Sequence, residues 1–430
     1  MKIFIYDEFN PEDTAMLQAL YSRSAASVTE HVAKVRQSGS GKFMEKYYVG
    51  YGHASIADCG SATIFLEGVS MLVAKAVQDW PLYSGQETSS RYMDLSRQPI
   101  IDPVGTPASR TILDGWMEFY TNNQTTVAEH LKIKYSKRAD EDEAVYERAI
   151  KARTFDILRG FLPAGVTTQL SWHTNLRQAW DKLALLRYWP LPEVQAVARE
   201  VHQKLRGKYQ SSFSHQLSAE QERYWKFLGA KHTFYLEKKY RGNFTAKTNI
   251  KPAELNRYRG ILRRRPPKTN LPHFLSRLGH CTFDFLLDFG SFRDIHRHRN
   301  GVCRMPFLTT RFGFNQWYLE QLPEALRLKA KKLIAEQKIA IAKLKVPHEL
   351  TQYYIAMGFN VTCQVSYGLP ATVYVVELRS GKMVHPTLRR VAHKMDAFLR
   401  RKFPALKLYS DLDPDDWDIR RGRQDIKEKP

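Results

Sequence analysis

The chain has 430 residues, of which 43% are hydrophobic and 26% charged, and its formal net charge is +22. This composition excludes a disordered or fibrous protein and provides enough apolar residues for two domain cores. There is no apolar run near the roughly 20 residues of a membrane span, and the 4 cysteines are scattered, without the spacing of a disulfide framework or a zinc site. We therefore expect a cytoplasmic protein that has no membrane or metal partner and attracts anions.

The first half of the chain predicts alternating strands and helices. Residues 2–6 form a short strand, and Asn10-Pro11-Glu12-Asp13 starts a helix that should extend to residue 26. A strand followed by a helix is expected over residues 61–77. Two helices, around 113–135 and 141–158, lead to the segment 159–172 and to a helix over 176–189.

The second half repeats this order in a looser form. Residues 281–299 predict a strand that leads through a helix into a polar loop, and residues 322–344 predict a long helix. Ser89 to Tyr92 have a counterpart in Thr309 to Phe312. We therefore predict an α+β protein with two tandem copies of one domain, each a small sheet packed with long helices, at residues 1–225 and 226–430.

The segment SGQETSSRY, Ser84 to Tyr92, carries the strongest signal for a ligand. It combines three serines, a threonine, an amide, a carboxylate and an arginine, a density of donors and acceptors that neither a core nor a plain surface loop requires. The segment predicts a polar, anionic partner.

The stretch His296 to Arg299, HRHR, is the second candidate site. A metal site is disfavoured, because adjacent guanidinium groups repel a cation and no carboxylate or thiol stands at ligand spacing. Arg297 and Arg299 offer forked donors that suit phosphate or the carbonyl groups of a flavin, with His298 between them. A solvated basic helix end is the alternative for this stretch.

SGQETSSRY resembles the Ser-x-Asn-Glu-x-Ser-x-Arg-Tyr loop of the flavin-dependent thymidylate synthases, with Gln86 in place of the asparagine. The family has Arg-His-Arg before this loop. The first half holds Asp79, Trp80 and Pro81 there, whereas the second half keeps Arg297-His298-Arg299 and has lost the loop. Each half thus keeps what the other has lost. Further blocks similar to the family cover most of residues 1–200 and, more narrowly, residues 293–299 and 375–392.

The resemblance implies an enzyme that methylates dUMP to dTMP with FAD, NADPH and methylenetetrahydrofolate, at one composite site between the two repeats. Arg379, Ser89 and Arg187 are the implied catalytic residues, and Arg379 would polarise the uracil ring, with Arg187 as its twin. The implied substrate-binding residues are Ser84, Gln86, Glu87, Ser89, Ser90, Arg91, Tyr92 and Arg159. The implied cofactor-binding residues are His53, Ser55, Asn175, Arg177, Arg297, His298 and Arg299.

Two alternatives to this function stay open. The first is the same flavin and folate chemistry on another pyrimidine nucleotide, since Gln86 and Asp294 depart from the family pattern. The second is a non-catalytic protein that binds nucleotides or nucleic acid, which the charge of +22 and the interrupted motifs favour. Because members of the family form homotetramers, the resemblance also implies that a tandem chain forms a homodimer with four domains.

Overall fold

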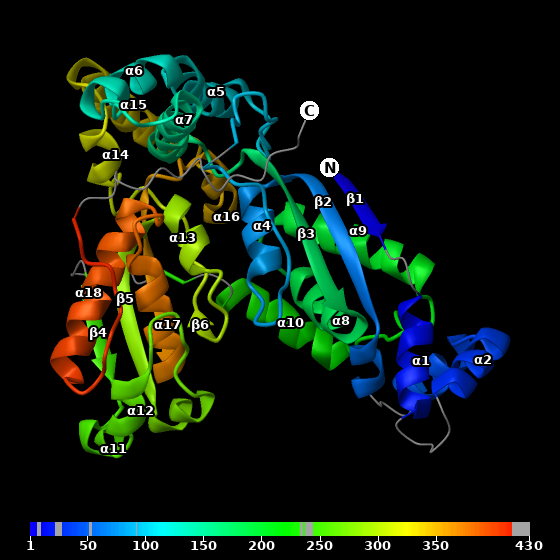
Figure 1. Cartoon of the computed structure of the whole chain (residues 1–430). Helices are drawn as coiled ribbons and strands as arrows, with labels where there is room; N and C mark the ends of the chain where they lie inside the picture. Colours follow the sequence, from blue (N-terminus) through cyan, green and yellow to red (C-terminus); the bar gives the residue numbers. More distant parts are fainter. Residues whose placement is uncertain are drawn as a thin grey trace. The chain divides into compact units, whose positions relative to one another are not determined.

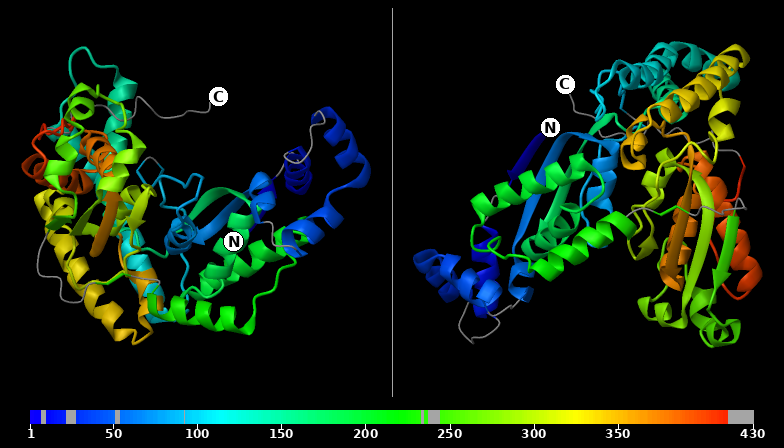
Figure 2. Two further views of the ribbon diagram at one scale, coloured as in Figure 1. Left: turned by 90° about the horizontal axis from the view of Figure 1, so that it is seen from below. Right: turned by 180° about the vertical axis from the view of Figure 1, so that it is seen from behind.

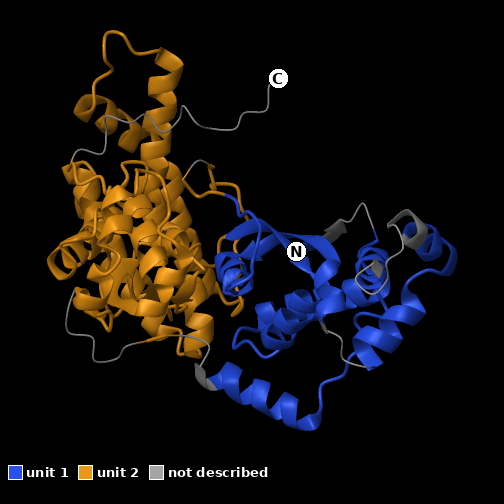
Figure 3. Cartoon of the chain, turned by 60° about the horizontal axis from the view of Figure 1, so that its bottom comes forward, with its two compact units in different colours: residues 1–88, 167–233 blue, residues 89–166, 234–430 orange. Residues whose placement is uncertain are grey.

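The computed structural model describes residues 1–6, 10–21, 28–50, 54–91, 93–232, 235–236 and 244–414. Helices and two small antiparallel sheets make up the described chain, which confirms the α+β class (Figure 1). The chain divides into two compact units (Figure 3). Unit 1 comprises residues 1–88 and 167–233, and unit 2 comprises residues 89–166 and 234–430. No helix in the described ranges has the length and apolar character needed to cross a bilayer.

Unit 1 is built on a sheet with the strand order β1-β2-β3, all antiparallel. The strands are β1 (Lys2–Tyr6), β2 (Ser61–Ser70) and β3 (Thr167–Asn175). Helices α4, α8 and α9 contact this sheet, and all eight residues of α4 are buried. The helices of unit 1 are α1 (Pro11–Tyr21), α2 (Val28–Ser38), α3 (Gly41–Phe43), η1 (Met44–Gly50), η2 (Ala54–Cys59), α4 (Met71–Gln78), α8 (Leu176–Leu186), α9 (Pro192–Lys208) and α10 (Ala219–His232).

Unit 2 is built on a sheet with the order β4-β5-β7-β6. The strands are β4 (Phe244–Thr248), β5 (His280–Asp288), β6 (Gly301–Cys303) and β7 (Asn360–Gly368). Helices α5, α6, α7 and α15 form a helical layer beyond one end of this sheet (Figures 1 and 2). The helices of unit 2 are α5 (Pro107–Asn122), α6 (Gln124–Lys134), α7 (Glu143–Leu158), η3 (Arg159–Phe161), α11 (Pro252–Asn256), α12 (Arg259–Arg264), η4 (His273–Leu278), α13 (Phe289–Ile295), α14 (Gln316–Glu320), α15 (Glu324–Lys343), α16 (His348–Thr351), η5 (Gln352–Tyr354), α17 (Leu369–Ser380) and α18 (Pro386–Lys402).

The same order of elements occurs twice in the chain. A 3-10 helix, a strand and a helix (η2, β2, α4) are followed later by η3, β3, α8 and α9, and the second series is η4, β5 and α13 followed by η5, β7, α17 and α18. Strands β3 and β7 both have 9 residues, and α9 and α18 both have 17 and begin with proline. This order supports a duplication. The boundary at residues 225 and 226 stays a prediction. The two compact units are defined by how the chain packs and not by the duplication, and they place residues 89–166 in unit 2.

Two equivalent segments of the repeats, residues 160–165 and 353–358, pair with each other inside unit 2. Ala164 N donates to Ile355 O (2.9 Å) and Met357 N donates to Leu162 O (2.8 Å). Gly165 N donates to Tyr353 O (2.9 Å) and Gly358 N donates to Gly160 O (2.7 Å). Each bond has a counterpart with the two segments exchanged, so the crossing has local two-fold symmetry. It anchors the end of the 89–166 segment to the second repeat.

The crossing gives a prediction for Gly358. A Cβ atom there would lie 2.4 Å from the Phe314 ring and 2.8 Å from Gly160 O. We expect Gly358→Ala to lower the free energy of unfolding by about 1–3 kcal/mol, because a packed core does not admit the added methyl group. Thermal unfolding of the full chain measures this change.

Gly260→Ala is the matched control within unit 2. Gly260 lies in α12, and its added Cβ would meet only Arg264 Nη1, at 3.9 Å. A helical alanine is favoured over glycine by up to about 1 kcal/mol, so this variant should unfold no earlier than the wild type. Equal unfolding temperatures for the two variants would contradict the role of the crossing.

Candidate functional site

The segment Ser89 to Arg91 lies in unit 2, where it meets α13. Ser89 Oγ accepts a hydrogen bond from Arg91 N (3.3 Å), and the equivalent Thr309 Oγ1 accepts one from Arg311 N (3.2 Å), which supports the alignment of the two repeats. Ser90 is buried, and its Oγ accepts a hydrogen bond from Arg293 Nη1 (2.7 Å). The polar segment of the first repeat is thus joined to the helix that precedes the HRHR motif of the second.

Arg91 is held by a buried carboxylate. Its Nε and Nη2 donate to the two oxygens of Asp156, at 2.7 and 3.1 Å, and its Nη1 donates to Met383 O (3.2 Å). Asp156 is fully buried on α7, whereas the Arg91 side chain is 13% exposed. A bidentate pair of this kind fixes the plane of the guanidinium group. Asp156 therefore fixes the orientation of the Arg91 guanidinium group, while a small part of the side chain remains exposed to solvent.

Asp294, on α13, is surrounded by positive charge. Arg379 Nη2 donates to its backbone carbonyl (2.6 Å), and Arg297 Nε lies 3.9 Å from its Oδ1. Burial disfavours the carboxylate, but nearby guanidinium groups outweigh burial and hold the pKa of Asp294 well below its ordinary value. These groups belong to Arg91, Arg159, Arg379 and Arg297. The region around Asp294 therefore carries a net positive charge, because one aspartate is surrounded by four arginines.

His298 and Arg379 form a pair at the end of α17. Arg379 Nε donates to His298 Nε2 (2.7 Å), so the imidazole proton of His298 is on Nδ1. Burial, and then the charge of Arg379, lower the pKa of His298 to about 3. A neutral His298 therefore positions a charged Arg379. Arg297 is the exposed member of the motif, with a side chain that is 51% exposed, and its carbonyl accepts from Arg299 Nη1 (3.3 Å).

A fully buried polar network underlies α13, and no sequence motif predicted it. Asp288 caps the helix and accepts hydrogen bonds from Tyr318 (2.6 Å) and Thr387 (2.5 Å). Ser291 bonds to His385 Nδ1 (3.0 Å), and His385 Nε2 bonds to the carbonyl of Asp156 (3.3 Å). A lone serine or histidine in an apolar stretch has no pattern that predicts such a network. It fixes the helix that carries Arg293 and Asp294.

Arg159 belongs to the same buried layer. Its Nη2 donates to Ser291 Oγ (3.0 Å), and the side chain is 2% exposed. It acts on the candidate site through its charge on Asp294, not through an open surface. Unit 2 therefore brings together many of the predicted residues, namely Ser89, Ser90, Arg91, Arg159, Arg297, His298, Arg299 and Arg379.

The remaining predicted residues lie elsewhere. Ser84, Gln86 and Glu87 belong to unit 1, where Gln86 bonds through its backbone to Ser171 of β3 and Glu87 forms a buried ion pair with Lys75 (2.7 Å). Unit 1 also contains Ser55, Asn175, Arg177 and Arg187. Predicted positions His53 and Tyr92 fall outside the described residues.

Three of these unit 1 side chains have structural partners. Asn175 caps α8 by accepting a hydrogen bond from Gln178 N (2.8 Å). Arg177 forms a bidentate pair with Asp58, at 2.8 and 2.7 Å. Arg187 is partly buried, which lowers its pKa, and its guanidinium lies 5.7 Å from the centre of the Trp180 ring. Their predicted roles toward a flavin or a pyrimidine stay predictions.

The Arg91–Asp156 pair predicts a large effect of Asp156→Asn. Removing one partner of a buried ion pair leaves an uncompensated charge, which costs about 3–5 kcal/mol of stability. Asp114→Asn is the matched control, because the Arg110–Asp114 pair of α5 is about half exposed, and such pairs contribute under about 1 kcal/mol. Urea unfolding compares the two variants, and a similar small loss in both would contradict the burial of the pair.

His298 predicts a pH dependence of stability. Since its pKa falls from 6.5 to about 3 on folding, its contribution is present above about pH 6.5 and is lost as the pH falls toward 3. When the pH is lowered from 7 to 5, the free energy of unfolding of the wild type should fall because of His298. In His298→Gln this fall should be smaller, by up to about 2 kcal/mol. Urea unfolding at both pH values measures this, and an unchanged pH dependence would contradict a buried, neutral imidazole.

Comparison with known proteins identifies relatives of the chain. Residues 6–209 match the family model described as "Thymidylate synthase complementing protein". A UPF0159 protein of Chlamydia muridarum is 24% identical, over 90% of this chain and 84% of that protein. A UPF0159 protein of Thermoplasma acidophilum is 22% identical, over 92% of this chain and 94% of that protein. Over residues 6–209, the chain is therefore similar to the thymidylate synthase complementing proteins.

Proposed function

We propose that the protein methylates dUMP to dTMP with FAD, NADPH and methylenetetrahydrofolate, at a site built in unit 2 from both repeats. The observation that carries this proposal is that the SGQETSSRY segment bonds through Ser90 to Arg293 of α13, the helix whose Asp294 is contacted by Arg297 and Arg379. The family match supports a thymidylate synthase-like activity. The flavin, the co-substrates and the identity of the nucleotide are part of the proposal.

The donor set fits anionic, oxygen-rich ligands. Arg379 adds a guanidinium donor to the hydroxyl of Ser89, and together they suit the oxygens of a pyrimidine nucleotide, whereas the exposed fork of Arg297 suits the carbonyl oxygens of a flavin. The side-chain oxygen Oδ2 of Asp294 is buried and has no hydrogen-bond partner among the described residues, so an N–H group of a ligand ring can satisfy it. A pyrimidine nucleotide and a flavin both present carbonyl oxygens and ring N–H groups.

Arg379 is the candidate for polarising the uracil ring. Its Nε and Nη2 are used by His298 and by the carbonyl of Asp294, which leaves Nη1 to meet a ring carbonyl. A fixed positive charge there stabilises the negative charge that develops on the ring oxygen when the ring becomes nucleophilic. Because these bonds are already in place, little reorganisation is needed during the reaction.

Ser89 and the HRHR motif would hold the ligands. The Oγ of Ser89 accepts from Arg91 N, so the hydroxyl proton remains to donate to a phosphate or a ring oxygen. Arg297 and Arg299, next to His298, would bind the flavin. When bound, the flavin supplies the reducing equivalents of the reaction, and the chain contributes position and charge.

The test is an assay of the purified full chain with dUMP, methylenetetrahydrofolate and NADPH. We expect a flavin spectrum that NADPH bleaches, and formation of dTMP. Arg379→Ala should lower kcat/KM for dUMP by roughly 100-fold or more, because it removes a preorganised donor. Arg311→Ala is the matched control, since Arg311 is exposed at the place in the second repeat that Arg91 takes in the first.

The outcomes separate the candidate functions. Flavin reduction by NADPH without dTMP would contradict dUMP as the substrate and favour another pyrimidine nucleotide. If the purified protein contains no flavin and forms no dTMP, but binds DNA or RNA in a salt-sensitive way, the proposed enzymatic activity is contradicted. That result would favour the nucleic-acid-binding protein that the charge of +22 suggests. The proposed homodimer is checked separately, by light scattering of the full chain.

A further inference from the structure

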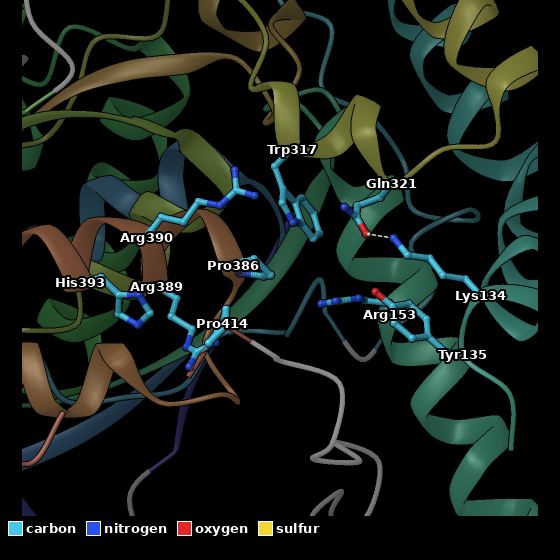
Figure 4. A pocket seen from close by; sticks show the side chains of 10 residues that line it. All are labelled: Lys134, Tyr135, Arg153, Trp317, Gln321, Pro386, Arg389, Arg390, His393 and Pro414. Atoms are coloured by element: carbon cyan, nitrogen blue, oxygen red, sulfur yellow. Dashed lines mark hydrogen bonds between the residues drawn. The ribbon is translucent and has the colours of Figure 1, made fainter. Parts of the chain in front are cut away.

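A cavity in unit 2, separate from the candidate site, lies among α6, α7, α14 and α18. It encloses about 340 Å³, which is within the range of small-ligand sites. Lys134 and Arg153 come from the α6–α7 side, and Arg389 and Arg390 come from α18. Figure 4 shows Arg153 and Arg390 extending toward the same opening from opposite walls. The cavity is therefore lined by positive charge from three separate helices.

The lining residues in the described part of the chain include no aspartate or glutamate. Arg390 lies 3.9 Å from the carboxylate of Glu320, and both side chains are more than half exposed. A pair with that exposure compensates little charge. Lys134, which is exposed, donates to the neutral amide of Gln321 (3.4 Å; Figure 4). The positive charges of Arg390 and Lys134 are thus only weakly compensated by these contacts, so both side chains can bind an anion.

Arg389 has a different role in the same wall. It is buried, and it donates to Ser380 O (2.6 Å) and to Asp411 Oδ1 (3.3 Å). These bonds fix the start of α18, and the Asp411 carboxylate neutralises part of the charge of Arg389. The bonds of Arg389 therefore hold the start of α18 in place, whereas the neighbouring Arg390 side chain is more than half exposed and open to a ligand.

The cavity is connected to Arg91 through Trp317, His385 and Asp156. The ring of Trp317, in its lining, packs edge-on against His385, with 4.5 Å between the ring centres. His385 Nε2 bonds to the carbonyl of Asp156, the partner of Arg91. The charge of Arg153, also in the lining, acts on Asp156 as well. Charge bound in the cavity would act on Arg153, and through Asp156 on the candidate site.

We propose that this cavity is a second ligand site, which binds the phosphate group of a small molecule with Arg390 and Lys134 as its accessible contacts. The forked guanidinium group of Arg390 and the ammonium group of Lys134, on facing walls, match the several oxygens of a phosphate. The ligand is inorganic phosphate, pyrophosphate or a nucleotide, which share this chemistry. The site is distinct from that of Arg297 and Arg379 and does not depend on the proposed catalytic function.

The experiment is calorimetric titration of the full chain with inorganic phosphate, pyrophosphate and AMP, at constant ionic strength set with chloride. We expect the double variant Arg390→Glu/Lys134→Glu to bind the preferred probe at least tenfold more weakly than the wild type. Arg390→Gln/Lys134→Gln should show an intermediate loss, and circular dichroism confirms that both variants are folded. The order of the three dissociation constants shows whether the site prefers inorganic phosphate, pyrophosphate or a nucleotide.

Lys331→Glu/Lys338→Glu is the matched control. Both lysines are exposed on α15, outside the cavity lining, and the variant has the same change in net charge. Binding within twofold of the wild type is expected there, which excludes a general attraction by the charge of +22. An equal loss in the control, a loss caused instead by Arg297→Gln, or no binding of any probe to the wild type would overturn the proposal.

Discussion

The buried ion pair between Arg91 and Asp156 is the interaction on which the candidate site depends. It joins the polar segment of the first repeat to α7, and the carbonyl of Asp156 is bonded to His385, which precedes α18 of the second repeat. A carboxylate that is fully buried requires an oriented cation, because an unpaired charge in the core is very costly. The pair therefore fixes Arg91 beside α13, where Ser90 bonds to Arg293 and Asp294 faces four arginines.

The crossing of residues 160–165 and 353–358 explains why this arrangement occurs within one compact unit. Its matching hydrogen bonds bind the end of the 89–166 segment to the equivalent segment of the second repeat. Residues that are far apart along the chain then come into contact, such as Ser90 and Arg293, which are 203 positions apart. A chain with two degenerate copies of one motif can in this way assemble one complete set of donors from both copies. The loss of Arg-His-Arg in one repeat and of the serine-rich loop in the other is consistent with this arrangement.

Much of the fold was predictable because its local signals are strong. The strand and helix over residues 61–77, the helix over residues 322–344 and the equivalence of Ser89 with Thr309 follow from hydrophobic pattern and motif. The helix predicted around residues 113–135 is instead two, α5 and α6, because the backbone at Asn123 leaves the helical conformation. The sequence also could not indicate that the SGQETSSRY segment is divided between the units after Thr88, since that depends on packing. Asp156, Ser291 and His385 escaped prediction because isolated buried polar residues have no periodic signature.

The central claim is that Ser89 of the first repeat and Arg379 of the second contact the same bound nucleotide. The most direct measurement is a double-mutant cycle for dUMP binding to the full chain, with Ser89→Ala, Arg379→Ala and the combination. Residues that contact one ligand together should show a coupling energy of about 0.5–3 kcal/mol. Strictly additive effects, or an unchanged dissociation constant in either single variant, would contradict the claim.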